Sequence, residues 1–304
     1  MEEKVIVLLS AYNGEKYINE QIESILAQSY KNIKLFIRDD GSTDGTVEIL
    51  KTYEKNPRIR VSYGENLGYF ASFLWLLNQC DEAEYYAFSD QDDYWYPDKI
   101  ETALKWLKEY SNIPALYCCN ADICDANLQL IHKGRPTKYP FSIPRTVVNG
   151  ETGWGYTQVM NHNARQLLMG KKAPSYVKVY GHDTWIHLSC LCCGTVLYDK
   201  TVHAKMRRHG NNTSIQEYQG GSFWRHQLWR INEFFFHNKG KAVYIEGREF
   251  LNEFLNELSV EEKSTIMLYL ESGHRFRKAL YAHRYRDSIL DEIFLRILFL
   301  FGKM

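Results

Sequence analysis

Apolar and polar positions alternate in blocks along the first 125 residues. Continuous apolar runs such as Val5–Leu9 predict strands buried on both faces of a parallel sheet. Between these runs the apolar residues fall at helical spacing, as in Ile18–Gln28. Strands are expected at 5–9, 33–38, 58–63, 85–89 and 115–119, and helices at 18–28, 43–53, 70–80 and 97–110. This alternation predicts an α/β domain with a mostly parallel central sheet flanked by helices.

The pattern changes after residue 125. Three of the seven prolines lie between residues 127 and 151, a segment expected to consist of loops. Residues 151–170 and 178–198 have a mixed pattern. Helical spacing returns from Gly221, and helices are predicted at 222–237, 241–258 and 260–271. We therefore expect one domain over residues 1–215 and a helical region over 216–304.

The composition excludes several classes of protein. The chain carries 37 basic and 37 acidic side chains, and 14% of its residues are aromatic. Neither a disordered chain nor a globally basic nucleic-acid binder has this balance. The seven cysteines, an odd number with adjacent pairs, favour a reducing compartment. Because neither a targeting signal nor a long apolar span is visible, a cytoplasmic location is expected.

Polar and acidic side chains follow three of the predicted strands. They are Ser10–Asn13, Asp39–Ser42 and Asp90–Asp93. Ligands of open α/β sheets bind at the carboxyl ends of the strands, and acids gathered there repel each other unless a cation neutralises them. Oxygen ligands without thiolates select Mg²⁺ or Mn²⁺, which suits a diphosphate leaving group. A dinucleotide-binding domain and a P-loop nucleotidase are disfavoured, because neither GxGxxG nor GxxxxGK[ST] occurs.

Three segments then identify a family resemblance. Residues 5–14, 38–44 and 89–95 resemble glycosyltransferase family 2, whose members are inverting, nucleotide-sugar-dependent enzymes of the GT-A fold. The form Ser-Asp-Gln-Asp-Asp-Tyr-Trp, with Asn66-Leu67-Gly68 upstream, is similar to the bacterial rhamnosyltransferase branch. The resemblance covers roughly residues 4–215. It implies a nucleotide-sugar-binding half over 1–120, an acceptor-binding half over 121–215 and a helical C-terminal extension over 216–304.

The resemblance also implies a donor site. Asp40 matches the carboxylate that accepts a hydrogen bond from the uracil or thymine N3–H, whereas Asp39 is expected to be structural. Asp92 matches the direct ligand of Mg²⁺ or Mn²⁺, and Asp90 or Gln91 is expected to reach ribose or the metal's waters. The expected nucleotide-sugar-binding residues are Ser10, Ala11, Tyr12, Asp40, Asn66, Gly68, Asp90, Gln91 and Arg208.

Residues 206–212 resemble the family segment Tyr-Arg-x-His-Gly-x-Asn, with Met206 in place of Tyr. The resemblance implies that His209 completes the metal shell or contacts the diphosphate. Arg207 and Arg208 are expected diphosphate partners, because guanidinium groups suit phosphate oxygens.

The acceptor side needs a base that takes the proton of the attacking hydroxyl. Many family members carry Glu-Asp before a helix, and the matching pair here is His182-Asp183. We interpret Asp183 as the general base; the alternative is an Asp that caps the helix. Trp95, Trp154 and Tyr156 are candidates to stack on an acceptor sugar, with simple packing as the alternative.

The tail has its own charge pattern. Residues 274–304 hold seven Lys or Arg against three acids, a net charge of +4, and an apolar stripe at helical spacing. Such a segment is typical of peripheral contact with an anionic membrane surface; a packing or dimerisation helix is the alternative.

These observations predict a metal-dependent inverting glycosyltransferase on the inner face of the cell membrane or in the cytoplasm. By resemblance it moves L-rhamnose from dTDP-L-rhamnose onto a glycan or lipid-linked acceptor of bacterial cell-surface polysaccharide. The alternatives are transfer from a UDP-hexose or UDP-N-acetylhexosamine and, more remotely, nucleotidyl transfer.

Overall fold

The computed structural model describes residues 2–134, 136–149, 151–172, 181–210, 212, 239–271 and 273–303. The chain forms two compact units. Unit 1 contains Met1–Pro136, Gly153–Gly170 and Gly194–Arg208. Unit 2 contains Thr137–Thr152, Lys171–Cys193 and His209–Met304. The chain thus passes between the units several times, whereas the sequence suggests a single division at residue 215.

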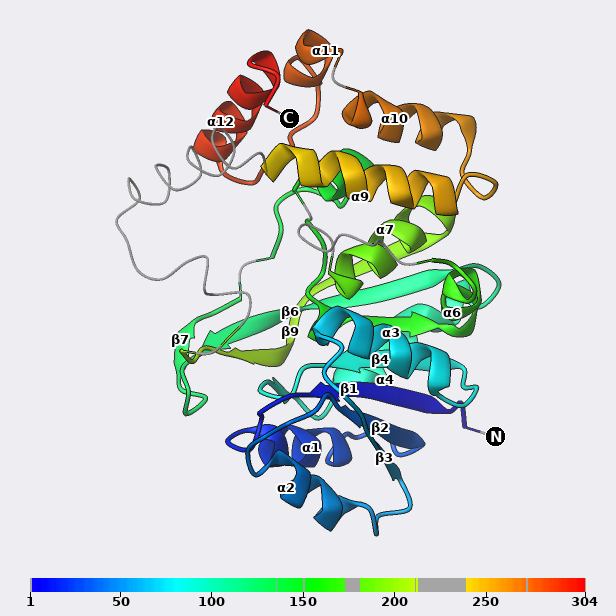
Figure 1. Cartoon of the computed structure of the whole chain (residues 1–304), viewed down its shortest axis with the longest axis vertical. Helices are drawn as coiled ribbons and strands as arrows, with labels where there is room; N and C mark the ends of the chain where they lie inside the picture. Colours follow the sequence, from blue (N-terminus) through cyan, green and yellow to red (C-terminus); the bar gives the residue numbers. More distant parts are fainter. Residues whose placement is uncertain are drawn as a thin grey trace. The chain divides into compact units, whose positions relative to one another are not determined.

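Unit 1 is built on one sheet (Figure 1). Its strands are β1 (Val5–Ala11), β2 (Ile33–Asp39), β3 (Ile59–Tyr63), β4 (Tyr85–Ser89), β5 (Tyr94–Trp95), β6 (Ala115–Cys124), β7 (Leu130–His132), β8 (Val159–Asn161) and β9 (Thr195–Arg207). They lie in the order β3-β2-β1-β4-β8-β6-β9-β5, and β7 pairs with β6. β1 pairs in parallel with β2 and β4, and β2 with β3, which confirms the parallel arrangement expected for the first four strands.

Most strands of the sheet run in one direction, as expected, and the other half of the sheet adds antiparallel strands. β8 lies antiparallel between β4 and β6, and β5 is antiparallel to β9. The sequence hides β8 because three residues are too few to show a period. Since β8 opposes both of its neighbours and β6 runs parallel to β9, strands β1, β2, β4, β6 and β9 all end at one edge. We call this carboxyl edge the rim.

Helices cover both faces of the sheet. They are α1 (Ile18–Leu26), α2 (Thr46–Tyr53), α3 (Tyr69–Gln79), α4 (Lys99–Leu107, continued by the 3₁₀ turn Lys108–Tyr110) and α6 (His162–Leu168). One face of β1 joins a core with apolar residues of α1, α2 and α4. On the opposite face, Phe73 of α3 packs edge-on against Phe88 of β4, with ring centroids 6.0 Å apart. β1 is therefore buried on both sides, as its continuous apolar run predicts.

Helix α2 begins at Thr46, three residues later than expected. The hydroxyl of Ser42 accepts a hydrogen bond from the Asn13 N–H (2.9 Å) instead of capping the helix. Asp44 provides a side-chain acceptor at the start of the helix instead, since its carboxylate accepts from the Thr46 N–H at 3.0 Å. The polar residues after β2 thus hold a turn at the rim before the helix starts.

Unit 2 is helical in its described part. Its helices are α5 (Ile143–Asn149), α7 (His182–Cys193), α9 (Lys239–Glu253), α10 (Val260–Leu270), α11 (Arg275–Ala279) and α12 (Ile289–Leu300). α5 lies where loops were expected; its Pro144 is in the first turn, where no backbone N–H is needed. α9 and α10 confirm two predicted helices, and Ser259 with Glu262 forms a capping box on α10. The helix predicted at 222–237 lies outside the described residues.

The core of unit 2 contains stacked aromatic rings. Trp185 of α7 lies edge-on to Phe250 and Phe254, with centroids 5.5 and 5.3 Å away. All seven cysteines of the chain are free thiols, as their number and spacing suggest. Among the described residues, none of the helices combines the length and the apolar character needed to span a membrane.

Candidate donor site and catalytic residues

The turns after β1 and β2 are locked together at the rim. Asn13 has a left-handed backbone (φ +49°), and its side-chain oxygen accepts from the Thr43 N–H at 2.8 Å. The Gly14 N–H donates to the Thr46 hydroxyl at 2.8 Å. The Glu15 carboxylate accepts from the Gly45 N–H at 2.7 Å. Two segments 30 residues apart therefore act as one rigid piece, which presents Tyr12 half-exposed.

The acidic loop after β4 is joined to the same turn through Gln91. The Tyr12 N–H donates to Gln91 Oε1 and Gln91 Nε2 donates to the Tyr12 carbonyl, each at 2.8 Å. A Cβ on Gly14 would lie 2.2 Å from Gln91 Oε1, so only glycine leaves room for this pair. Both ends of the Gln91 amide are engaged. The structure thus gives Gln91 a positioning role, and its expected contact with ribose stays a prediction.

The two acids at the end of β2 have different partners. Asp39 accepts from the N–H groups of Gly41 (3.2 Å) and Ser42 (3.1 Å), which fits its expected structural role. Asp40 is 2% exposed, and its carboxylate accepts from the N–H groups of Leu67 and Gly68, both at 2.9 Å. It is also paired with Arg38. Among the described residues, two of these bonds fall on Oδ1 and one on Oδ2, so Oδ2 has one lone pair that no described group occupies.

Asp40 thereby organises the loop before α3. Within this loop Asn66 Oδ1 accepts from the Gly68 N–H at 3.0 Å, and Gly68 has a φ of +82° that favours glycine. Arg38 holds the loop from below by donating to the Glu65 carbonyl at 2.8 Å. On the neighbouring strand the Ser10 hydroxyl bonds the Ser72 hydroxyl at 2.6 Å. The expected residues Ser10, Asp40, Asn66 and Gly68 thus lie on adjoining, mutually bonded segments.

The acidic loop itself holds carboxylates at two depths. Asp90 and Asp92 are half-buried, whereas Asp93 is buried and accepts from the Arg207 N–H at 3.1 Å. Burial, followed by repulsion from Asp92 and Asp90, raises the pKa of Asp93 well above its usual value.

Arg207 holds this loop in place from β9. Its side chain donates to the carbonyls of Asp92 (2.8 Å) and Ala126 (2.6 Å) and pairs with Glu20 of α1. The guanidinium is buried over the ring of Tyr17. Arg207 is therefore a structural clamp, which corrects its expected role as a diphosphate partner. The next residue, Arg208, has a buried Nε with no hydrogen-bond partner among the described residues. Arg208 therefore remains a candidate partner of the diphosphate.

The oxygen ligands available at the rim match in part what a hard divalent cation needs. In the described ranges no three His, Cys, Asp or Glu side chains lie close enough to hold an ion by themselves. Mg²⁺ is nevertheless commonly held by one or two carboxylates together with substrate phosphates, and Asp90 and Asp92 fit that pattern. His209 belongs to unit 2, where its N–H donates to Asn212 Oδ1 at 2.6 Å and its Nε2 lies 3.3 Å from Asn212 Nδ2.

The three aromatic candidates for acceptor binding differ in how much of each side chain is exposed. Trp95 is 0% exposed and lies in the core, with the Lys99 ammonium 3.5 Å from its ring centre. Tyr156 is 4% exposed and is stacked beneath Trp154 at 5.8 Å. Both are packing residues, which corrects the expectation that they stack on a sugar. Trp154 is 44% exposed and offers an open ring surface.

Asp183 is the second residue of α7 in unit 2. Its Oδ1 accepts from the Thr184 N–H at 2.8 Å, and the helix already begins at His182, so Asp183 is not the residue that caps it. Burial raises the pKa of this carboxyl above its usual value. Burial lowers the pKa of His182 to about 3, so this residue is neutral.

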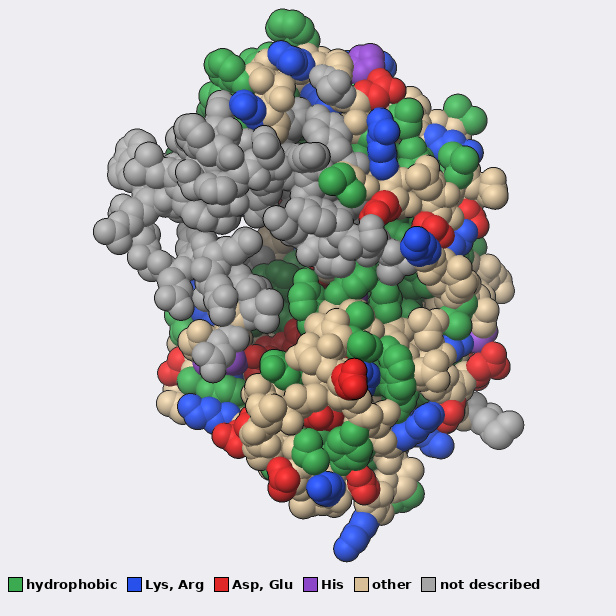
Figure 2. Space-filling view, viewed as in Figure 1, with side chains coloured by type: hydrophobic (Ala, Val, Ile, Leu, Met, Phe, Trp, Pro, Cys, Tyr) green, Lys and Arg blue, Asp and Glu red, His purple; other side chains and the backbone are tan. Residues whose placement is uncertain are grey.

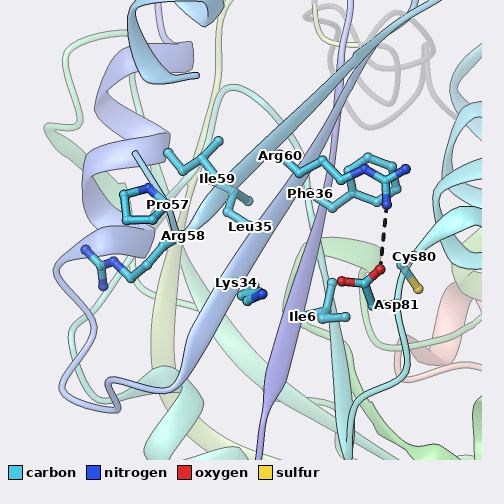
Figure 3. A pocket seen from close by; sticks show the side chains of 10 residues that line it. All are labelled: Ile6, Lys34, Leu35, Phe36, Pro57, Arg58, Ile59, Arg60, Cys80 and Asp81. Atoms are coloured by element: carbon cyan, nitrogen blue, oxygen red, sulfur yellow. Dashed lines mark ion pairs between the residues drawn. The ribbon is translucent and has the colours of Figure 1, made fainter. Parts of the chain in front are cut away.

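A pocket of about 130 Å³ lies away from the rim, near the amino ends of the first three strands (Figure 3). Arg60 lies over the ring of Phe36 at 4.4 Å and pairs with Asp81 at 3.8 Å on its wall. None of the expected site residues lines this pocket. It therefore has no part in the donor site.

Comparison with known proteins agrees with this geometry. Residues 6–166, more than half of the chain, match the model of "Glycosyl transferase family 2". The chain belongs to glycosyltransferase family 2. An uncharacterized glycosyltransferase of Rickettsia prowazekii is 30% identical over 266 residues, which cover 84% of this chain and 79% of the relative. The putative teichuronic acid biosynthesis glycosyltransferase TuaG of Bacillus subtilis is 40% identical over 109 residues, or 35% of this chain and 43% of TuaG.

Solved structures share the fold. S. aureus TarS 1–349 in complex with UDP-GlcNAc has a TM-score of 0.58 at 16% identity, with 98% of this chain and 92% of that chain covered. The mannosyltransferase PcManGT of Pyrobaculum calidifontis, in complex with GDP-Man and Mn²⁺, has a TM-score of 0.53 at 15% identity, with coverage of 100% and 86%. The expected GT-A fold with a helical C-terminal region is confirmed.

Proposed function

We propose that this glycosyltransferase moves L-rhamnose from dTDP-L-rhamnose, with inversion, onto a glycan or lipid-linked acceptor of bacterial cell-surface polysaccharide. The observation that carries the proposal is the rim, where Tyr12, Asp40, the 66–68 loop and the Asp90–Asp93 loop are bonded into one scaffold. The relationship to TuaG supports a role in surface polysaccharide.

The roles at the rim follow from each residue's surroundings. Asp40 receives the base N3–H through the remaining lone pair of Oδ2, and Tyr12 covers the base with its exposed ring. Asp92, supported by Asp90, holds Mg²⁺ or Mn²⁺, with His209 as the further proposed ligand. The ion, when bound, neutralises charge on the leaving diphosphate. Arg208, whose Nε has no bond among the described residues, pairs with the same oxygens.

Asp183 acts on the acceptor. In the proposed reaction the acceptor oxygen forms a bond to the anomeric carbon while the bond from that carbon to the diphosphate oxygen breaks. The hydroxyl proton passes to Asp183, and the nucleoside diphosphate leaves with the bonding electron pair. Trp154 supports the acceptor ring with its open surface.

A second candidate is transfer from a UDP-hexose or UDP-N-acetylhexosamine. The fold shared with TarS, which was crystallised with UDP-GlcNAc, favours it. Family membership leaves nucleotidyl transfer without support. Thermal-shift titration with dTDP, UDP and GDP, each with Mn²⁺, separates the donors. Stabilisation by dTDP is expected, and stabilisation by UDP alone would replace the rhamnosyl assignment with the second candidate.

The role of Asp183 is tested by Asp183→Asn and by the pH profile. The variant is expected to keep the wild-type melting temperature and nucleotide affinity but to lose at least about a thousandfold in kcat. Because burial raises the pKa of Asp183 and only the carboxylate accepts a proton, wild-type kcat/KM should fall about tenfold per pH unit below that raised pKa. Persistent transfer by Asp183→Asn would show that another group is the base.

For residues 274–304 we propose peripheral contact with the inner face of the cell membrane, with a homodimer as the alternative. An enzyme with a lipid-linked acceptor benefits from such contact, since both substrates then meet at one surface. Either membrane contact or a homodimer would use the exposed surface of α11 and α12.

A further inference from the structure

Helix α12 has two apolar faces instead of one. Leu295, Leu298 and Phe299 are buried inside unit 2. Ile289, Ile293, Ile297 and Leu300 recur at helical spacing on the other side and remain exposed. A helix that only packs against its own unit needs the first set and not the second. The outer stripe is therefore available for something beyond the unit.

Helix α11 adds to this surface. Phe276 and Leu280 stand four residues apart, one turn of helix, and both are exposed. The two helices pack on each other, and Arg296 of α12 donates to the Ala279 carbonyl at the end of α11 at 2.7 Å. Hydrophobic side chains and Lys or Arg side chains gather at this end of unit 2 (Figure 2). The six exposed apolar side chains named for α11 and α12, each 40–77% exposed, are called the outer stripe below.

Exposed basic side chains lie beside the outer stripe. Arg275 and Arg277 of α11 are exposed. Of the three acids in the segment, Glu292 is buried and accepts from the N–H groups of Tyr285 and Arg286, both at 2.8 Å. Asp291, in the first turn of α12, is half-buried. Asp287 is paired with Arg145 at 3.0 Å. The net positive charge of the tail is therefore presented to the exterior beside apolar side chains.

We infer that the outer stripe docks this protein on a membrane that contains anionic lipid, with α12 lying flat in the interface. At 12 residues α12 is about 18 Å long, too short to cross a bilayer but suited to rest among headgroups. Anionic headgroups complement Arg275 and Arg277. A second copy meeting this face would instead bring like charges into one interface. The inference gives the lipid-linked acceptor of the proposed function a place, but docking is a property of this segment alone.

The test uses full-length protein in vesicle flotation. We expect the wild type to float with vesicles of phosphatidylcholine and phosphatidylglycerol, and less with phosphatidylcholine alone or in high salt. The variant Ile293→Ser/Ile297→Ser should lose at least about tenfold in partitioning. Leu130→Ser/Ile131→Ser is the matched control, because these side chains are as exposed but lie on β7 of unit 1. The variant Arg275→Gln/Arg277→Gln should lose the preference for anionic vesicles.

Three results would overturn the inference. They are a wild type that does not float, an equal loss in the β7 control, and a dimer in solution that Ile293→Ser/Ile297→Ser dissociates while vesicles bind neither protein. Nucleotide affinity measured on the same variants keeps this question apart from the donor assignment. Unchanged affinity with lost flotation places the defect in docking, and wild-type flotation with no nucleotide binding places it in the proposed function.

Discussion

The rim of unit 1 and the outer stripe of unit 2 differ in how their side chains are held. Those at the rim are bonded within the chain, whereas those of the outer stripe are left exposed. At the rim, Gln91, Asp40 and Arg207 are all held by other groups of the chain. On α12 the carboxylate of Glu292 is held inside the unit, and apolar side chains of α11 and α12 stay exposed. A rim built in this way keeps its shape before a donor arrives, as preorganised sites require. The outer stripe is completed only by what it binds.

This contrast has an energetic consequence. Rim side chains make hydrogen bonds within the chain, so that their removal leaves buried partners unsatisfied and destabilises the fold. Outer-stripe side chains make few contacts within the unit, so that their removal alters binding and leaves the free energy of unfolding nearly unchanged. Substitutions in the two regions can therefore test whether this difference between the rim and the outer stripe exists.

Among substitutions at the rim, Arg207→Met should have the largest effect. Removal of the guanidinium leaves the carbonyls of Asp92 and Ala126 without their donor and Glu20 without its partner. We expect a loss of about 3 kcal/mol in the free energy of unfolding, measured by urea denaturation. Affinity for the stabilising nucleotide with Mn²⁺ should fall about tenfold, because the Asp90–Asp93 loop loses its clamp.

Arg208→Met is the matched control for this substitution. Arg208 is the next residue and is only half-buried, and its backbone N–H donates to the Cys124 carbonyl at 2.8 Å. Its replacement should weaken nucleotide binding and change the unfolding free energy by less than about 1 kcal/mol. Equal destabilisation by the two variants would contradict the clamp assigned to Arg207.

Gly14→Ala should have an intermediate effect. The added Cβ would lie 2.2 Å from Gln91 Oε1 and would force the amide away from Tyr12. We expect a loss of about 1–3 kcal/mol in urea denaturation. In Gly14→Ala/Gln91→Ala the clash is gone, so the loss should be smaller than the sum of the single losses. Gly273→Ala, where no atom lies within 4 Å of the new Cβ, should change stability by less than about 0.5 kcal/mol. Strict additivity would mean that Gly14 serves something other than the Gln91 contact.

The sequence predicted the part of the fold that depends on long, regular patterns. The continuous apolar runs located β1, β2 and β4, and the acids that follow them were correctly expected at one edge. It could not predict β8, because three residues carry no periodicity, nor the mixed half of the sheet that β8 creates. Residue type also failed to separate Trp95 and Tyr156 from Trp154, because burial depends on neighbours distant in sequence.

The same limit applies to the polar residues of the site. Asp40 and Asp92 were found by motif, but the partners that hold their segments, Arg38 and Arg207, carry no local signal. Arg207 looks like a phosphate ligand in a linear sequence, since nothing there shows that Glu20 and the Asp92 carbonyl already occupy it. The sequence predicted a single apolar stripe in the segment of α12. Only the packed structure shows which face is buried and which is the outer stripe.

The smallest expected effect is that of Ile293→Ser, and it gives the comparison its sharpest test. Ile293 lies on the outer stripe of α12, whereas Leu298 lies on the buried face of the same helix. Ile293→Ser should change the free energy of unfolding by less than about 0.5 kcal/mol, because the side chain is already half in water. Leu298→Ser should cost about 2–5 kcal/mol, because it leaves a cavity and buries a hydroxyl. If urea denaturation gave the two variants similar losses, Ile293 would be covered within the folded protein, and the outer stripe would be core that needs no membrane.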